Sequence, residues 1–275
     1  MRKGNVQKMD NGNIIKIVPN QIEYIDMFEM LYSVFTKKEI DYIFKQAGAI
    51  QLTLGCNSNC SPRCTRVPRG VKMAFSLDSL TEVIDKYGNS LVKNNFYPYW
   101  DSEPLDHPSF FDFMKNVKEK TGYVPFVCTT VPEGSWDMAI ELIDNGMLRK
   151  GPYKGCADDG KISLPYFMEA GKKIYPNGME ERIDGFVEHV AQKKGITVSE
   201  ARAILPINEI KHHINPKGCW ESLFIISPKK DETGTGVNHY ESYSTSTNHL
   251  ANEINRSNIG KYMKDGYNHR IRIMT

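Results

Sequence analysis

Strand-like and helix-like patterns alternate along the middle of this chain. Short apolar runs, some alternating with polar residues, predict strands at residues 49–54, 96–100, 124–130, 161–164, 207–214 and 222–227. Apolar residues at helical spacing predict helices at 76–87, 108–120, 134–146 and 180–194, and a helical turn at 197–204. Repeated strand–helix units form parallel sheets with helices outside, and about six strands favour an open or partial barrel over a closed eight-stranded one. The expected fold is α/β, a partial (β/α)6 barrel over residues 49–228.

Both ends of the chain differ from this core. Residues 22–47 carry helical spacing, and Thr36-Lys37-Lys38-Glu39 has the capping-box pattern that starts a helix. We therefore expect residues 1–48 to form an N-terminal helical extension. After Pro228 the composition changes to a polar loop, a segment rich in Ser, Thr and Tyr, and a basic, aromatic tail. We expect residues 229–275 to be a C-terminal extension that covers the barrel.

Composition limits the protein class only loosely. Of 275 residues, 40% are hydrophobic and 25% are charged, as in ordinary globular proteins. A net charge of +2 calls for neither a nucleic-acid nor a membrane partner, although it leaves a nucleic acid open. No apolar run is long enough to cross a bilayer, so the expected location is cytoplasmic. Six cysteines in so long a chain do not form a disulfide framework, and thiols stay reduced in the cytoplasm.

Three of these cysteines, Cys56, Cys60 and Cys64, lie within nine residues, directly after the first predicted strand. Closely spaced thiolates are soft ligands for iron or zinc, and three of them leave one metal position for another ligand. We interpret the segment as the ligand loop of an iron–sulfur cluster with one open iron. The alternative is a structural zinc site completed by a distant cysteine or histidine.

This loop resembles the signature loop of the radical S-adenosylmethionine (radical SAM) superfamily. In that family the loop follows the first strand of a partial barrel, and three cysteines hold a 4Fe–4S cluster whose fourth iron binds S-adenosylmethionine (SAM). The usual cysteine spacing has three and then two intervening residues, with an aromatic residue before the last cysteine. Here both gaps hold three residues, and Arg63 stands at the aromatic position.

A second resemblance is Asp101-Ser102-Glu103-Pro104, at the end of the second predicted strand. Family members commonly have Gly-Gly-Glu-Pro there, which receives the amino group of SAM. The resemblance implies that Glu103 contacts this ammonium, which needs acceptors, and that Asp101 either adds to the contact or faces the substrate. Taken alone, Glu103 would be an ordinary solvated carboxylate at a strand end.

The later segments follow the family order over residues 49–228. Thr130 closes the third predicted strand, where relatives often have Thr-Asn. Ser163 lies on the fourth strand, where a serine often contacts the ribose or carboxylate of SAM, and Arg182 starts the next helix and would pair with that carboxylate. Ser163 and Arg182 fit capping or surface roles equally well. In parallel α/β folds, sites collect at the carboxyl ends of strands, where these segments end.

The resemblance implies an enzyme that cleaves SAM reductively to a 5′-deoxyadenosyl radical and abstracts hydrogen from a substrate. It also implies an electron donor such as flavodoxin or ferredoxin. The substrate, a small metabolite or a nucleoside or nucleic-acid base, is not identified by the sequence. The alternative function is a non-catalytic binding protein whose α/β scaffold is stabilised by zinc or iron.

Overall fold

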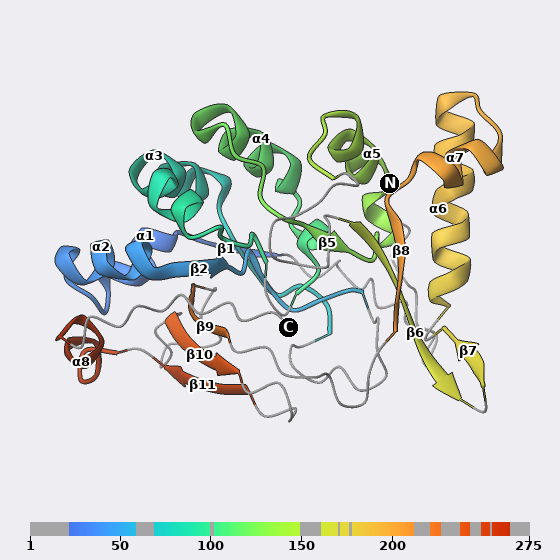
Figure 1. Ribbon diagram of the computed structural model, residues 1–275. Coiled ribbons are helices and arrows are strands. Elements are labelled where there is room, and N and C mark those ends of the chain that lie inside the picture. The colour runs from blue at the N-terminus through green and yellow to red at the C-terminus, as the bar shows by residue number, and fades with distance from the viewer. Residues whose placement is uncertain are drawn as a thin grey trace, which may run out of the picture.

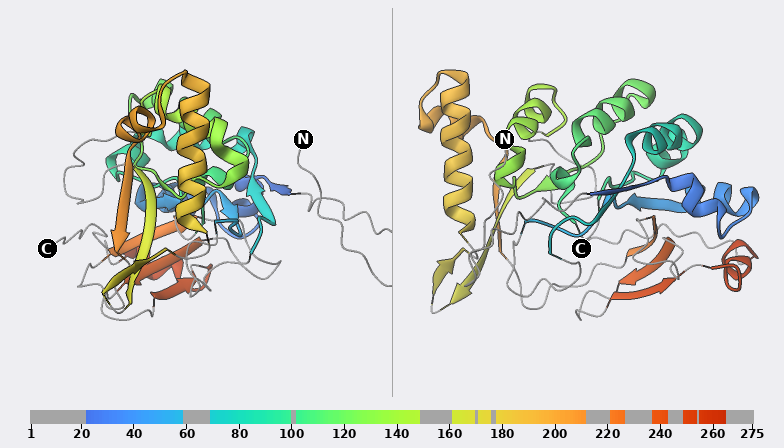
Figure 2. Two further views of the ribbon diagram at one scale, coloured as in Figure 1. Left: turned by 90° about the vertical axis from the view of Figure 1, so that its right-hand side faces the viewer. Right: turned by 180° about the vertical axis from the view of Figure 1, so that it is seen from behind.

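Helices and strands occupy opposite sides of most of the molecule in the computed structural model. Helices α3 (Leu77–Lys93), α4 (Phe110–Thr121) and α5 (Trp136–Asp144) follow one another along one side, with most strands below them (Figures 1 and 2). Helix α6 (Met179–Lys194) stands upright at the end of this row, beside the strands there. The structure describes residues 22–58, 69–99, 102–148, 161–169, 171–175, 178–211, 221–226, 237–242, 249–253 and 255–264.

Parallel strand pairs follow the predicted strand–helix order. Strand β5 (Cys128–Thr129) pairs in parallel with β6 (Lys161–Glu169), and β6 pairs in parallel with β8 (Ile207–Lys211). At the other end, β2 (Ala47–Ile50) is parallel to β9 (Glu221–Ile226). These pairings, with helices between successive strands, confirm the mixed α/β class. The described strands form three separate sheets rather than one continuous layer, so they do not by themselves make a barrel.

Two predicted strands are much shorter than expected, and prolines explain why. In the described part of the segment predicted at 96–100, residues 96–99 contribute only a bridge, in which Tyr97 exchanges backbone hydrogen bonds of 2.9 Å with Gly48 and Ile50. The expected strand at 124–130 is reduced to the two residues of β5. Pro98 and Pro125 interrupt these segments, and a proline has no N–H to continue a ladder.

The first predicted strand divides in two. After β2 ends, β3 (Thr53–Leu54) pairs antiparallel with β4 (Met73–Phe75), which in turn is parallel to β1 (Glu23–Ile25). The chain thus leaves β3, makes the cysteine loop and returns as β4 beside it. This small sheet forms the base of the loop.

The helices bury amphipathic faces against the strands, as their spacing predicts. Ser76 caps α3 by accepting a hydrogen bond from the Ser79 N–H (3.2 Å), and Gly122 ends α4 in the left-handed conformation. The apolar faces share one core, whose fully buried members include Leu80, Val83 and Leu91 of α3, Phe110, Phe113, Met114 and Val117 of α4, and Ile183, Phe186 and Val187 of α6.

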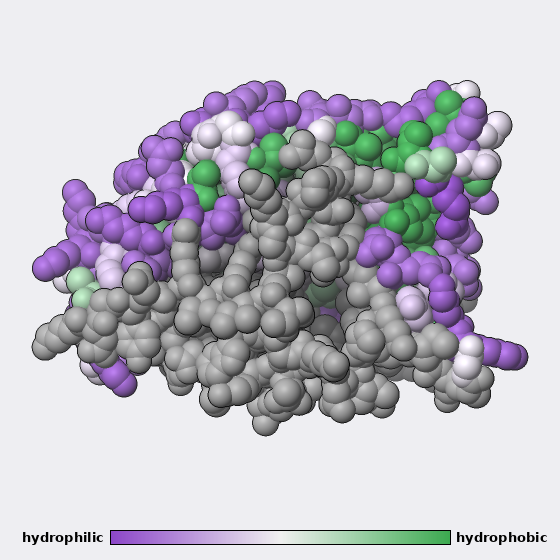
Figure 3. Space-filling model, viewed as in Figure 1, coloured by the Kyte–Doolittle hydropathy of each residue, from purple (hydrophilic) through white to green (hydrophobic). Residues whose placement is uncertain are grey.

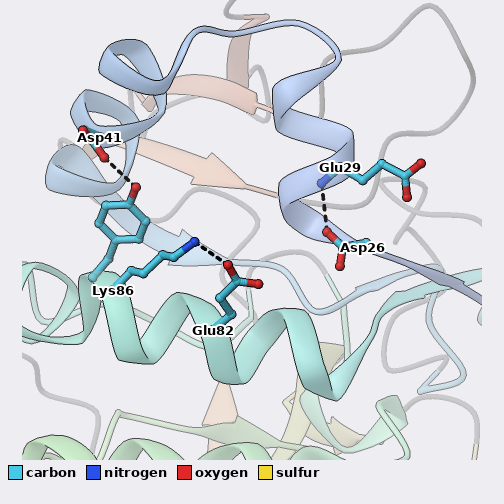
Figure 4. Close-up of polar contacts among 6 residues, drawn as sticks. Asp26, Glu29, Asp41, Glu82 and Lys86 are labelled. Carbon is cyan, nitrogen blue, oxygen red and sulfur yellow. Dashed lines mark hydrogen bonds and ion pairs between the residues drawn. The ribbon is translucent and has the colours of Figure 1, made fainter.

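The N-terminal helices α1 (Met27–Tyr32) and α2 (Lys37–Gln46) pack against α3. The predicted capping box is confirmed, because Thr36 and Glu39 exchange side-chain and backbone hydrogen bonds. The Phe44 ring stacks on Tyr87 of α3 with a centroid distance of 4.3 Å, and the Tyr87 hydroxyl donates to Asp41 (2.6 Å). Figure 4 shows Asp41 in its hydrogen bond with the tyrosine hydroxyl, together with the Lys86–Glu82 ion pair on α3 and the Asp26 cap of α1.

Further elements complete the described structure. Strand β7 (Lys172–Ile174) forms a hairpin with β6, and the predicted turn after Thr197 is helix α7 (Val198–Ile204), with its own capping box. Strand β10 (Val237–Ser242) lies between β9 and β11 (His249–Glu253) in an antiparallel arrangement, and α8 (Ile259–Lys264) follows. The sequence did not predict β1, β4, β7, β10 or β11.

The described surface in the view of Figure 3 is largely hydrophilic, with hydrophobic residues in separate patches. Within the described ranges, no helix combines the length and the apolar character needed to cross a bilayer.

Candidate functional site at the base of the cysteine loop

The two ends of the cysteine loop are joined at its base. The Cys56 carbonyl accepts from the Gly70 N–H (3.0 Å), and one step outward the Leu54 carbonyl accepts from the Lys72 N–H (2.9 Å). Gly55 has φ +103°, and a Cβ there would lie 2.0 Å from the Gly70 carbonyl oxygen. Only glycine permits both this backbone conformation and this close approach. Cys60 and Cys64 lie outside the described residues.

The Cys56 sulfur is half-buried and accepts backbone hydrogen bonds. The Ser58 N–H donates to Sγ (3.4 Å), and the Glu103 main chain also contacts the sulfur. Burial raises the pKa of the Cys56 thiol to about 12, the carboxylates of Glu103 and Asp106 act in the same direction, and the backbone contacts oppose it. Without metal the group is a neutral thiol; a metal ion would displace its proton.

These features fit a metal-bound thiolate, because N–H donors to sulfur stabilise the thiolate ligands of iron–sulfur clusters. Among the described residues, no group of three His, Cys, Asp or Glu side chains is placed to hold a metal. Of the predicted cysteine ligands, that part of the chain includes Cys56 alone.

Glu103 is buried, with 4% of its surface exposed, so the solvated-carboxylate alternative is wrong. Its carboxylate accepts from the Leu105 N–H (3.2 Å), the Thr129 hydroxyl, and both the N–H and the hydroxyl of Thr130 (2.9 Å each). Burial raises the pKa of Glu103, and the donors from Thr129 and Thr130 counteract the shift. Four donors match the acceptor capacity of a carboxylate. Glu103 therefore ties the 3₁₀ helix η1 (Pro104–Asp106) to the end of β5.

Arg182 and Thr130 meet the cysteine loop at Ser58. The Arg182 guanidinium, on the first turn of α6, donates to the Ser58 carbonyl (2.9 Å), and the Ser58 and Thr130 hydroxyls are hydrogen-bonded to each other. Glu103, Thr130 and Arg182 were predicted as site residues from separate segments. The structure brings all three to the residues around Cys56.

Backbone strain marks the end of β5. Val131, directly after Thr130, has φ +49°, which is rare for a β-branched residue, and its N–H donates to the Thr129 hydroxyl (2.9 Å). Strained backbone of this kind gathers at functional sites, where the surrounding contacts maintain it.

The remaining predicted site residues are placed less completely. Ser102 is buried beside Glu103, with 8% of its surface exposed. Ser163 lies on β6 opposite Asn208 of β8, which places its backbone in the parallel strands next to β5. Asp101 lies outside the described residues.

Sequence reasoning missed two loop contacts. Asp106 accepts from the backbone N–H (2.6 Å) and the side-chain amide (3.0 Å) of Asn57, and Ser58 links Cys56 to Thr130 and Arg182. Only the position of Asn57 and Ser58 directly after a cysteine would have pointed to them. His107, adjacent to Asp106, is fully buried and structural: its Nε2–H donates to the Phe75 carbonyl (2.8 Å), and Nδ1 accepts from the Ser109 N–H (3.2 Å).

Comparison with known proteins gives no assignment: no family model, curated protein or solved structure matches this chain.

Proposed function

We propose that this protein is a radical SAM enzyme. The observation that carries the proposal is that Glu103, Thr130 and Arg182, predicted from separate segments, all reach the cysteine loop. The Glu103 main chain contacts the Cys56 sulfur, and Thr130 and Arg182 bind Ser58, whose N–H donates to that sulfur. When bound, a 4Fe–4S cluster with an open iron supplies reductive cleavage of SAM to a 5′-deoxyadenosyl radical.

The proposal gives each predicted residue a task. Cys56, Cys60 and Cys64 would hold the cluster, and the segment from Asp101 to Glu103 would bind the ammonium of SAM. Because the Glu103 carboxylate already accepts four hydrogen bonds, its backbone and its neighbours would share in that contact.

Thr130, Ser163 and Arg182 complete the proposed SAM site. Thr130 and Arg182 lie at the strand and helix ends that face the loop. The guanidinium has five donors, so Arg182 can bind the Ser58 carbonyl and still pair with a carboxylate. Ser163 follows on the neighbouring parallel strand.

The fold supports a partial barrel as the finer architecture. The parallel pairs β9–β2 and β5–β6–β8, with the bridge between Ala49 and Tyr97, agree with the neighbour order of a (β/α)6 barrel, and the β9–β2 pair joins the sixth predicted strand to the first. The helices lie outside the strands, as such a barrel requires (Figure 1). We also propose a cytoplasmic location, where thiols stay reduced and flavodoxin or ferredoxin would supply the electron.

The function is tested by anaerobic reconstitution with iron and sulfide, followed by incubation with dithionite and SAM. We expect a brown protein that releases 5′-deoxyadenosine, and we expect Cys56→Ala to abolish the release. A colourless wild-type protein that carries one zinc and leaves SAM intact would support the non-catalytic binding protein instead. This assay detects the cleavage of SAM in the absence of substrate, so the substrate need not be known.

A further inference from the structure

Every polar group of Ser58 is engaged. Its N–H donates to the Cys56 sulfur (3.4 Å), its hydroxyl bonds to the Thr130 hydroxyl, and its carbonyl accepts from Arg182 (2.9 Å). Only 2% of the residue is exposed. A loop residue two positions after the first cysteine is thus fixed by contacts in three directions.

The direction of these hydrogen bonds follows from the acceptors. The Thr130 hydroxyl donates its single proton to the Glu103 carboxyl (2.9 Å), so the Ser58 hydroxyl donates to Thr130. Thr130 is itself held, because its N–H also donates to Glu103 (2.9 Å). Ser58 is therefore anchored to a buried carboxylate through one intermediate hydroxyl.

The contacts come from elements that are fixed independently of the loop. Thr130 directly follows β5, which is paired with β6. Arg182 lies on α6, next to Ile183, which is fully buried in the core. Both anchors thus belong to elements outside the loop, and Ser58 connects them to Cys56.

We propose that Ser58 is a positioning residue for the first cysteine ligand, and that Arg182 and Thr130 act on this ligand through Ser58. The proposal rests on the proposed function in that it takes Cys56 as a metal ligand. The segment around Cys56 is held in place before metal enters, which reduces the conformational entropy lost on cluster binding. Arg182 thus has a task in the metal-free protein, in addition to its proposed contact with SAM.

The test is residue-resolved amide hydrogen exchange in the metal-free protein. The Ser58 amide reports the bond to sulfur directly, and the neighbouring Asn57 amide, which donates to Asp106 (2.6 Å), is an internal reference. We expect Arg182→Gln and Thr130→Val each to raise the exchange rate at Ser58 about tenfold, the effect of losing one hydrogen bond. Asn57 should change less.

Two controls separate positioning from general destabilisation. Arg202→Gln removes an arginine from the exposed ion pair with Asp184 and should leave Ser58 exchange unchanged. Thr130→Ser retains the hydroxyl and should restore slow exchange relative to Thr130→Val. Thermal unfolding of each variant confirms that it is folded.

The outcomes distinguish this inference from the proposed function. If the Ser58 amide exchanges at the unprotected rate in the wild type, or remains protected in both Arg182→Gln and Thr130→Val, the positioning role is wrong, whether or not the protein binds iron. If those two variants lose protection but wild-type protein takes up no iron, the anchoring is correct and the proposed function fails. If the positioning role and the proposed function are both correct, Arg182→Gln and Thr130→Val should also retain less iron than Arg202→Gln after reconstitution.

Discussion

Gly55→Ala is the substitution that should most directly disrupt the base of the cysteine loop. Alanine would have to adopt φ +103°, and its Cβ would lie 2.0 Å from the oxygen and 2.9 Å from the carbonyl carbon of Gly70. Both obstructing atoms are backbone, so no side-chain rotation relieves the contact. The strands at the loop base would have to separate.

The loss of unfolding free energy in Gly55→Ala is the sum of the backbone strain and of the hydrogen bonds that break when the strands separate. Backbone strain at such a position costs about 1–3 kcal/mol. Separation of the strands removes the Gly70–Cys56 and Lys72–Leu54 backbone hydrogen bonds, at about 1 kcal/mol each. We therefore expect Gly55→Ala to lower the free energy of unfolding by roughly 3–5 kcal/mol.

Gly122→Ala is the matched control, because it tests positive φ without the close approach. Gly122 has φ +69°, and a Cβ at this position would meet no atom within 4 Å beyond its neighbours in the chain. Its cost should be about 1 kcal/mol. Urea unfolding, analysed with a common slope, measures both variants. Equal losses in the two variants would refute the argument that Gly70 forbids a side chain at position 55.

Three further predictions concern a buried histidine, a half-buried tyrosine hydroxyl and a helix cap. Burial lowers the pKa of His107 below its ordinary 6.5, so below that pH the unfolded chain binds more protons. The stability advantage of wild type over His107→Gln should therefore shrink from pH 7 to pH 5 in urea titrations; a constant difference would contradict this. Tyr87→Phe keeps the stacked ring but loses the bond to Asp41, and should cost about 0.5–1.5 kcal/mol, whereas a loss above about 3 would mean that the ring had moved. Thr36→Ala removes the capping box of α2 and should cost about 0.5–2 kcal/mol, with Thr36→Ser retaining most of it; equal losses for both would show that the cap contributes nothing.

The helices could be predicted from the sequence because local signals specify them. Ser76 and Thr36 cap the helices that their side chains suggest, and the apolar faces are buried as their spacing requires. Strand lengths were less predictable, because Pro98 and Pro125 shorten segments whose apolar character suggests longer strands. Strand β10 was missed because Val-Asn-His-Tyr-Glu-Ser has little apolar alternation and is placed by pairing with β9 and β11.

Only part of the candidate site could be predicted, because some of its residues are marked by local pattern and others by tertiary contacts alone. Glu103 and Thr130 follow expected strands, and the rule that sites lie at the carboxyl ends of parallel strands is enough to bring them together. Ser58 and Asp106 carry no pattern, since their roles depend on which loop and strand ends meet in three dimensions. The buried environment of Glu103 likewise follows from tertiary packing and not from its neighbours in sequence.

The central claim is that Cys56, Cys60 and Cys64 hold a 4Fe–4S cluster whose open iron binds SAM. Its most direct test is electron paramagnetic resonance of the reconstituted, dithionite-reduced protein, recorded with and without SAM. We predict the signal of a reduced 4Fe–4S cluster that changes when SAM is added, and the loss of that signal in Cys56→Ala. A reconstituted protein without a cluster signal, or with a signal that SAM leaves unchanged, would contradict the claim.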